Sequence, residues 1–219
     1  MFEWKRVLIL APHTDDAELG CGGTMARLLE EGVDLFVAVF STADQSLPKG
    51  APPGTLKEEF LMATKALGIP RENLEIFDFE VRKLNYHRQE ILENIIGLKR
   101  KINPDAVFLP ASTDLHQDHQ VIHAEGLRAF KQTTVLGYEL PWNHLSFGAD
   151  LLVELEDPHL EKKWEALQSY QTQFILERPY FRRELIEGLA RIRGVQAGVK
   201  YAEAYEVLRV VSRLPGKIE

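Results

Sequence analysis

The sequence predicts an α/β fold in which helices flank a mostly parallel β-sheet. Between residues 7 and 138, short apolar runs of strand length alternate with longer stretches of helical periodicity. This alternation favours parallel strands joined by right-handed crossover helices. The chain has 219 residues and no convincing linker or internal repeat, so residues 1–219 are expected to form a single domain.

Strands are expected where apolar residues run together between turn residues. The run Val7–Leu10 is apolar throughout, as in a central strand that is buried on both faces. Further strands are expected at Leu35–Phe40, Leu74–Phe79, Ala106–Leu109, Val135–Tyr138, Leu151–Leu155 and Tyr205–Val211. Helices are expected at Met25–Glu31, Leu56–Leu67, Glu90–Lys101, Val121–Phe130, Leu160–Phe174 and Glu184–Arg193, the first two closed by Gly32 and Gly68.

The composition narrows the class of protein. A formal net charge of −7 argues against nucleic-acid binding, which needs clustered Lys and Arg. Cys21 is the only cysteine, so an intramolecular disulfide is impossible and a reducing compartment is expected. No apolar run reaches the roughly 20 residues of a membrane span, and the N-terminus lacks the apolar core of a signal peptide. We therefore expect a cytoplasmic protein without a membrane span.

Two polar clusters follow two of the expected strands. The first runs from His13 to Glu18 after the first strand, and the second runs from Asp114 to His119 after the fourth. In open α/β sheets, ligands bind outside the carboxyl ends of the strands, where the strand order reverses. With the common order 3-2-1-4-5, strands one and four are neighbours at that point. The two clusters are therefore expected to face each other across one crevice.

The residue types in these clusters suit a metal-dependent hydrolase. Two histidines and one carboxylate, His13, Asp16 and His119, match the three protein ligands of a catalytic zinc site with an open position. The same set describes an iron(II) facial triad, so the choice of metal stays open. Asp15, adjacent to a ligand, suits a general base. A protonated His116 suits oxyanion stabilisation, with Asp118 orienting and charging it.

Three alternatives compete with this interpretation. Thr14, Asp15 or Asp118 can each serve only as a helix N-cap. The segment Gly20–Gly23 resembles the glycine-rich loop of a Rossmann-type methyltransferase or nucleotide-binding protein, although the polar cluster separates it from the strand end. A third candidate is a regulatory or structural protein that binds metal but does not hydrolyse a substrate.

The clusters carry a family resemblance. The segment from His13 to Gly20 resembles the first motif, His-Ala-Asp-Asp-Val-Glu-Ile-Gly, of the LmbE-like (PIG-L) N-acetylglucosaminyl deacetylases. Their second motif, His-Pro-Asp-His, is matched from His116 to His119, with Asp114 in the expected place before it. Further similarity runs through the segments 57–68, 163–173 and 198–203, in the correct order along the chain.

The resemblance implies the Rossmann-like fold of that family and the removal of an acetyl group from an N-acetylglucosamine-type sugar or sugar conjugate. It implies zinc bound by His13, Asp16 and His119. Asp15 matches the general base, and His116, supported by Asp118, matches the oxyanion-stabilising histidine. It also implies a homo-oligomer, hexameric in many close relatives.

One position departs from the family pattern. Many relatives carry an arginine before the Lys-Glu-Glu segment that contacts substrate or product, where this chain has Leu56. Lys57 is one candidate replacement, although it points about 100° away around the helix. The region from Tyr138 to Phe147, with Trp142, is expected to form part of the crevice wall.

Overall fold

Seven strands form one mixed sheet. The computed structural model describes residues 4–212, so the outermost residues of the expected domain, 1–3 and 213–219, lie outside the described part. The strands are β1 (Arg6–Ala11), β2 (Asp34–Val39), β3 (Leu74–Ile76), β4 (Ala106–Pro110), β5 (Thr134–Tyr138), β6 (Leu151–Leu155) and β7 (Tyr201–Arg209). Their order is β3-β2-β1-β4-β5-β7-β6. Strands β1 to β5 are parallel to one another and follow the order 3-2-1-4-5, so the expected order is confirmed. Strand β7 runs antiparallel to both β5 and β6.

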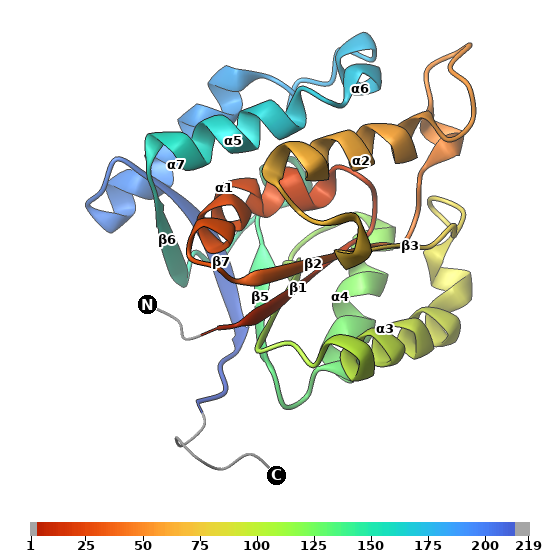
Figure 1. Ribbon diagram of the computed structural model, residues 1–219, viewed down its shortest axis with the longest axis horizontal. Helices are drawn as coiled ribbons and strands as arrows, with labels where there is room; N and C mark the ends of the chain where they lie inside the picture. The colour runs from red at the N-terminus through yellow and green to blue at the C-terminus, as the bar shows by residue number, and fades with distance from the viewer. Residues whose placement is uncertain (1–3, 213–219) are drawn as a thin grey trace.

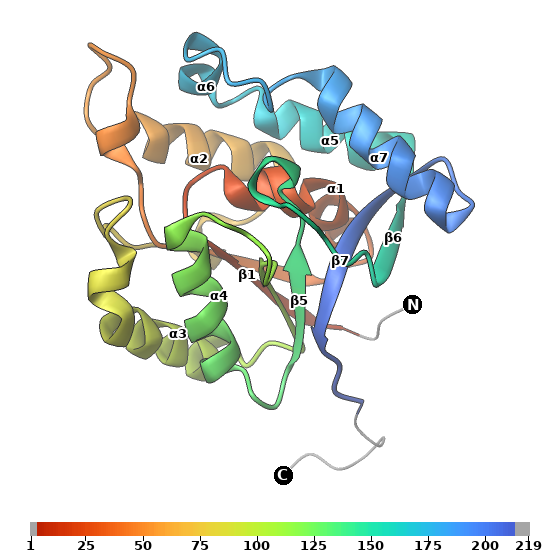
Figure 2. The same ribbon diagram turned by 180° about the vertical axis from the view of Figure 1, so that it is seen from behind.

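Helices cover both faces of this sheet (Figure 1). They are α1 (Asp16–Glu30), α2 (Thr55–Leu67), α3 (Arg88–Ile102), α4 (Gln117–Ala129), α5 (Asp157–Leu167), α6 (Gln171–Ile175) and α7 (Arg183–Ala197). Four short 3₁₀ turns, η1 (Asp44–Ser46), η2 (Arg71–Asn73), η3 (Leu84–His87) and η4 (Pro141–Asn143), lie in the connections. Seen from behind, α3 and α4 lie together on one face, opposite α1, α2, α5 and α7 (Figure 2).

Strand β1 has an uninterrupted apolar run because helices cover both faces of the sheet. Successive side chains of a strand point to opposite faces. Val7 and Ile9 pack in the core beneath α1, α2 and α5, whereas Leu8 and Leu10 pack in the core beneath α3 and α4. No helix within residues 4–212 has the length and apolar character needed to cross a membrane.

The structure corrects three of the expected boundaries. Helix α1 begins at Asp16 instead of Met25, because the glycine-rich segment is itself helical, with a break at Cys21 (φ −144°, ψ 19°). The expected helix 160–174 divides into α5 and α6, since Tyr170 is not helical. The last strand starts at Tyr201, four residues earlier than expected, in a segment whose residues 201–205 are all buried.

Candidate active site

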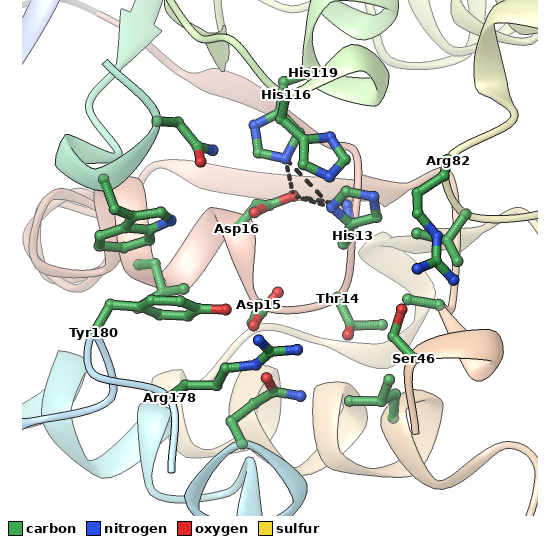
Figure 3. A pocket seen from close by; sticks show the side chains of 17 residues that line it. His13, Thr14, Asp15, Asp16, Ser46, Arg82, His116, His119, Arg178 and Tyr180 are labelled. Carbon is green, nitrogen blue, oxygen red and sulfur yellow. Dashed lines mark hydrogen bonds and ion pairs between the residues drawn. The ribbon is translucent and has the colours of Figure 1, made fainter. Parts of the chain in front are cut away.

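The two polar clusters meet at the carboxyl ends of β1 and β4. These strands pair in parallel, with Val7 opposite Ala106, so the loops that follow them start side by side. His13 comes from the turn between β1 and α1, Asp16 is the first residue of α1, and His119 lies in the first turn of α4. Figure 3 shows the three side chains converging at one end of a pocket. The expected juxtaposition of segments about a hundred residues apart is confirmed.

Three donor atoms lie at nearly equal distances from one another. His13 Nδ1 is 3.1 Å from Asp16 Oδ2, Asp16 Oδ2 is 3.3 Å from His119 Nε2, and His119 Nε2 is 3.3 Å from His13 Nδ1. Ligands about 2.0–2.1 Å from a tetrahedral zinc ion stand about 3.3 Å apart. The donor set therefore fits a small divalent metal. The rings of His13, His116 and His119 also offer three donors within 4.8 Å of one another, a wider and looser set.

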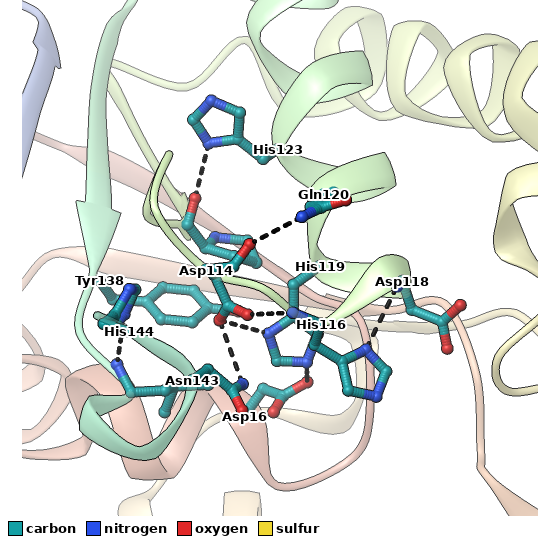
Figure 4. Close-up of polar contacts among 12 residues, drawn as sticks. Asp16, Asp114, His116, Asp118, His119, Gln120, His123, Tyr138, Asn143 and His144 are labelled. Carbon is teal, nitrogen blue, oxygen red and sulfur yellow. Dashed lines mark hydrogen bonds and ion pairs between the residues drawn. The ribbon is translucent and has the colours of Figure 1, made fainter. Parts of the chain in front are cut away.

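Each candidate histidine ligand is oriented by a carboxylate on its other nitrogen. His13 Nε2 lies 3.0 Å from Asp118 Oδ2, and His119 Nδ1 lies 2.7 Å from Asp114 Oδ2. Figure 4 shows Asp114 between His119 and Asn143, whose side-chain amide donates to the same carboxylate oxygen at 3.2 Å. Such partners fix the tautomer and ring orientation of metal-binding histidines. Sequence reasoning placed Asp114 in the motif but did not assign it this role.

The expected pairing of Asp118 with His116 is wrong in one respect. The Asp118 carboxylate accepts from His13 and from the backbone N–H groups of Arg82 and Leu84, not from His116. The contact to His116 comes from the Asp118 backbone N–H, which donates to His116 Nδ1 at 3.2 Å. His116 is thus the N-cap of α4, and neither Asp118 nor Asp15 caps a helix through its side chain.

The donor cluster shifts the pKa values of its members in opposite directions. Burial disfavours the imidazolium form of His13 and His119, but the charges and hydrogen bonds of the nearby carboxylates together outweigh it. Asp16 and Asp118 raise the pKa of His13 to about 9, and Asp16 and Asp114 raise that of His119 to about 10. Burial also disfavours the Asp16 carboxylate, yet His119 and His13 hold its pKa far below the usual range. In the absence of a metal, these groups form a buried ion cluster.

Asp15 and His116 differ from the donors. Burial, reinforced by the charge of Asp16, raises the pKa of Asp15 to about 7. Burial and the neighbouring His119 and His13 lower the pKa of His116 to about 4. His116 is therefore neutral at physiological pH, contrary to the expected protonated form. Because its Nδ1 accepts a hydrogen bond, the ring proton lies on Nε2.

A cavity of about 360 Å³ opens in front of these groups, and its lining includes Asp15 and His116. Trp142 forms part of the wall, as expected, and stacks on Tyr180 with ring centroids 4.3 Å apart. Leu56 faces the cavity, whereas Lys57 is exposed and outside the lining, so Lys57 does not replace the arginine of relatives. Sequence reasoning missed Arg82, Ser46, Gln173 and Arg178, which also line it.

The segment Gly20–Gly23 allows close packing of α1 and does not form a phosphate-binding loop. A Cβ at Gly20 would lie 2.4 Å from the Tyr138 ring, so α1 sits close to β5 only because this side chain is absent. The backbone N–H groups of Gly23 and Thr24 donate to the buried Glu203 carboxylate. They are therefore not available to a phosphate group, and the methyltransferase or nucleotide-binding alternative is not favoured.

Fold and site together define an α/β protein with a candidate metal centre at the switch point of its sheet. Residues 8–130 match the family described as PIG-L: GlcNAc-PI de-N-acetylase. This match covers more than half of the chain and contains both polar clusters. The chain belongs to the PIG-L family, and it is an enzyme of the deacetylase class, a hydrolase.

Individual relatives agree with this membership. The chain is 28% identical to an uncharacterized deacetylase, YaiS, of Escherichia coli K12, over 77% of this chain and 91% of that protein. It is 26% identical to the diacetylchitobiose deacetylase of Thermococcus kodakarensis, over 91% of this chain and 81% of that protein.

The fold is shared more widely than the reaction. The crystal structure of GalB, the 4-carboxy-2-hydroxymuconate hydratase of Pseudomonas putida KT2440, superposes with a TM-score of 0.79. The two chains are 21% identical, over 96% of this chain and 99% of GalB. The fold alone therefore does not define the chemistry, which has to be argued from the site.

Proposed function

We propose that this enzyme removes the acetyl group from the nitrogen of an N-acetylglucosamine-type sugar or sugar conjugate, releasing acetate and a free amine. The observation that carries the proposal is the triangle of donor atoms from His13, Asp16 and His119, with Asp15 beside it in an open cavity. Membership of the PIG-L family and similarity to a diacetylchitobiose deacetylase support the sugar substrate.

His13, Asp16 and His119 would hold the metal, for which zinc is the first choice and iron(II) the second. Nitrogen and carboxylate donors suit both ions, and the spacing of the three donors suits a tetrahedral site. When bound, such a metal supplies a Lewis acid that polarises the amide carbonyl and makes water acidic enough to react at neutral pH.

Asp15 would accept the proton of the attacking water, since a pKa of about 7 suits a base working near neutral pH. The neutral His116 ring would donate its Nε2 proton in a hydrogen bond to the oxygen that gains negative charge as water adds to the amide carbon. The C–N bond then breaks, and Asp15 returns its proton to the leaving amine. Asp118, through His13 and its backbone N–H to His116, would act as a positioning residue.

Metal content and amine release test this assignment together. The protein is purified without added metal, and the metal bound per chain and the amine released from N-acetylated sugars are measured for wild type and His119→Ala. His123→Ala is the matched control, because it lies one turn further along α4 and bonds the Pro110 carbonyl oxygen. We expect about one metal per chain in wild type and in the control, and loss of metal and activity in His119→Ala. A wild-type protein that binds no metal even when supplied with zinc would contradict the proposal.

The family resemblance also leads us to propose a homo-oligomer in the cytoplasm, with the hexamer of many close relatives as its expected form. Light scattering on the purified protein measures the number of chains directly, and a monomer at micromolar concentration would contradict the first part.

A further inference from the structure

The cavity contains two arginines whose side chains have no partner in the described part of the chain. Arg82, between β3 and α3, and Arg178, between α6 and α7, both line it, and Figure 3 shows both guanidinium groups directed into the pocket. Neither guanidinium forms an ion pair or a hydrogen bond with any residue between 4 and 212. The side-chain Nε of Arg178 is fully buried and has no partner there.

This is not how arginines near acidic groups behave elsewhere in the chain. Arg193 pairs with the buried Glu139, and Arg88 and Arg128 share the buried Glu125. A buried donor without a partner costs free energy, so such groups are rare unless a ligand satisfies them, and this applies to Arg178 Nε. Arg82 is exposed at the edge of the same cavity, and its guanidinium has no partner among residues 4–212. Both arginines are thus available to a ligand that accepts hydrogen bonds.

The backbone at Arg82 and directly before Arg178 has an uncommon conformation, and that of Arg82 is tied to the donor cluster. Arg82 has a left-handed backbone (φ 67°), and its N–H donates to Asp118 Oδ2 at 2.5 Å. The same oxygen accepts from His13, so one carboxylate ties the Arg82 backbone to the donor cluster. Glu177, directly before Arg178, is also left-handed (φ 51°). Non-glycine residues in this region are strained, and such strain concentrates where a site must keep its shape.

Two guanidinium groups favour one class of ligand. Arginine offers a planar fork of donors that matches the oxygens of a carboxylate or a phosphate. We propose that Arg82 and Arg178 form an anion subsite, and that the substrate of this enzyme is an N-acetylated sugar conjugate carrying a carboxylate or phosphate group. The inference rests on the proposed deacetylase function and adds the charge of the substrate. The proposed subsite would also supply positive charge to a cavity in which Leu56 stands in the place of the usual arginine.

Matched substrates test the subsite. Amine release is measured with N-acetylglucosamine, its 6-phosphate, and N-acetylmuramic acid, which carries a carboxylate. The quantity compared is the preference, the ratio of kcat/KM for the better charged substrate to kcat/KM for the neutral one. We expect a wild-type preference of at least tenfold that falls about 10–100-fold in Arg82→Met and Arg178→Met, as expected for a lost charged hydrogen bond.

Two further variants separate charge from packing. Arg178→Lys should keep part of the preference, because it keeps the cation. Arg182→Ala is the matched control, an exposed arginine four residues further on and outside the cavity lining, and it should keep the wild-type preference. A wild type without preference, or variants that lower kcat/KM equally for charged and neutral substrates, would overturn the subsite.

Calorimetry with inorganic phosphate and malate keeps this test independent of the reaction. If wild type releases no amine from any substrate, the proposed function fails, but the binding measurement still shows whether the anion subsite exists. Binding to the zinc-loaded wild type that weakens at least tenfold in Arg178→Met, but not in Arg182→Ala, supports the subsite. Equal binding to wild type and Arg178→Met, or none to wild type, overturns it.

Discussion

Asp15 and Asp16 are identical residues in adjacent positions, yet their surroundings give them opposite acidities. Asp16 lies between the rings of His119 and His13, and their charges hold its carboxyl group ionised. Burial of Asp15 beside the negative Asp16 outweighs the charges of nearby His13 and His119 and raises the pKa of Asp15 to about 7. A pair of carboxyl groups divided in this way is suited to divided roles, one as ligand and the other as proton carrier.

Replacing Asp15 with Asn should therefore leave the metal bound and lower kcat by roughly 10²–10⁴-fold, the usual contribution of a general base. In wild type, kcat/KM should rise with pH as Asp15 loses its proton. The midpoint should lie at or below about 7, because a bound cation favours the carboxylate. Amine release between pH 5 and 9 and metal content per chain check both parts. The exposed Asp34→Asn serves as control, and normal turnover in Asp15→Asn would remove Asp15 from the mechanism.

Glu18 is a residue of the first motif whose burial opposes stability. Its side chain is completely buried, and neither carboxyl oxygen has a hydrogen-bond partner in the described part of the chain. Burial raises its pKa from 4.5 to about 8. Between these values the folded protein binds more protons than the unfolded chain, so this group makes stability fall as pH rises.

Glu18→Gln should consequently be more stable than wild type at pH 8 and nearly equal to it at pH 5. The difference should grow by about 1.4 kcal/mol per pH unit above 4.5 and level off near pH 8. Urea unfolding of the metal-free proteins at several pH values measures it, with the exposed Glu72→Gln as control. Parallel stability curves for wild type and Glu18→Gln would show that the carboxyl group finds a partner.

At the scale of elements, α1 depends on a buried ion pair that joins it to α5 and β7. The break at Cys21 leaves backbone groups of α1 without helical partners. Lys163 donates to the carbonyl oxygen of Leu19 and to Glu203, each at 2.7 Å, while Glu203 accepts from the N–H groups of Gly23 and Thr24. Because α1 starts at Asp16, this pair also helps to position the donor cluster.

Lys163→Met should lower the free energy of unfolding by about 3–5 kcal/mol, because it leaves the Glu203 carboxylate buried without its counter-ion. Combining it with Glu203→Gln should cost less than the sum of the two single changes. Denaturant unfolding of the three variants gives the coupling energy. A loss below 1 kcal/mol for Lys163→Met would mean that the pair does not hold the broken helix.

At the scale of the whole molecule, metal binding should couple to folding and to pH. His13 and His119 must lose protons before they can bind a metal, and their pKa values of about 9 and 10 mean that protons compete at neutral pH. Zinc at a thousandfold excess over its Kd adds about 4 kcal/mol of stability. For a chain of this size, this corresponds to a rise in Tm of roughly 10 °C.

The rise in Tm at a fixed zinc concentration should be larger at pH 8 than at pH 6. Thermal unfolding with zinc and with a chelator measures it, and His119→Ala should show a much smaller rise at either pH. An equal rise at both values would mean that no protons leave the site when the metal binds.

The order of the elements and the candidate donors of the metal site could be predicted from the amino-acid sequence. Strand and helix periods are local properties, and the common strand order 3-2-1-4-5 makes strands one and four neighbours. His13, Asp16 and His119 are therefore expected at the same edge of the sheet. The pairing of carboxylates with histidines became known from the three-dimensional structure, in which Asp118 contacts His13 and Asp114 contacts His119. The structure also revealed Arg82 and Arg178 in the cavity and Lys163 against Glu203. These contacts join segments that no local pattern relates, and they depend on packing at the level of single side chains.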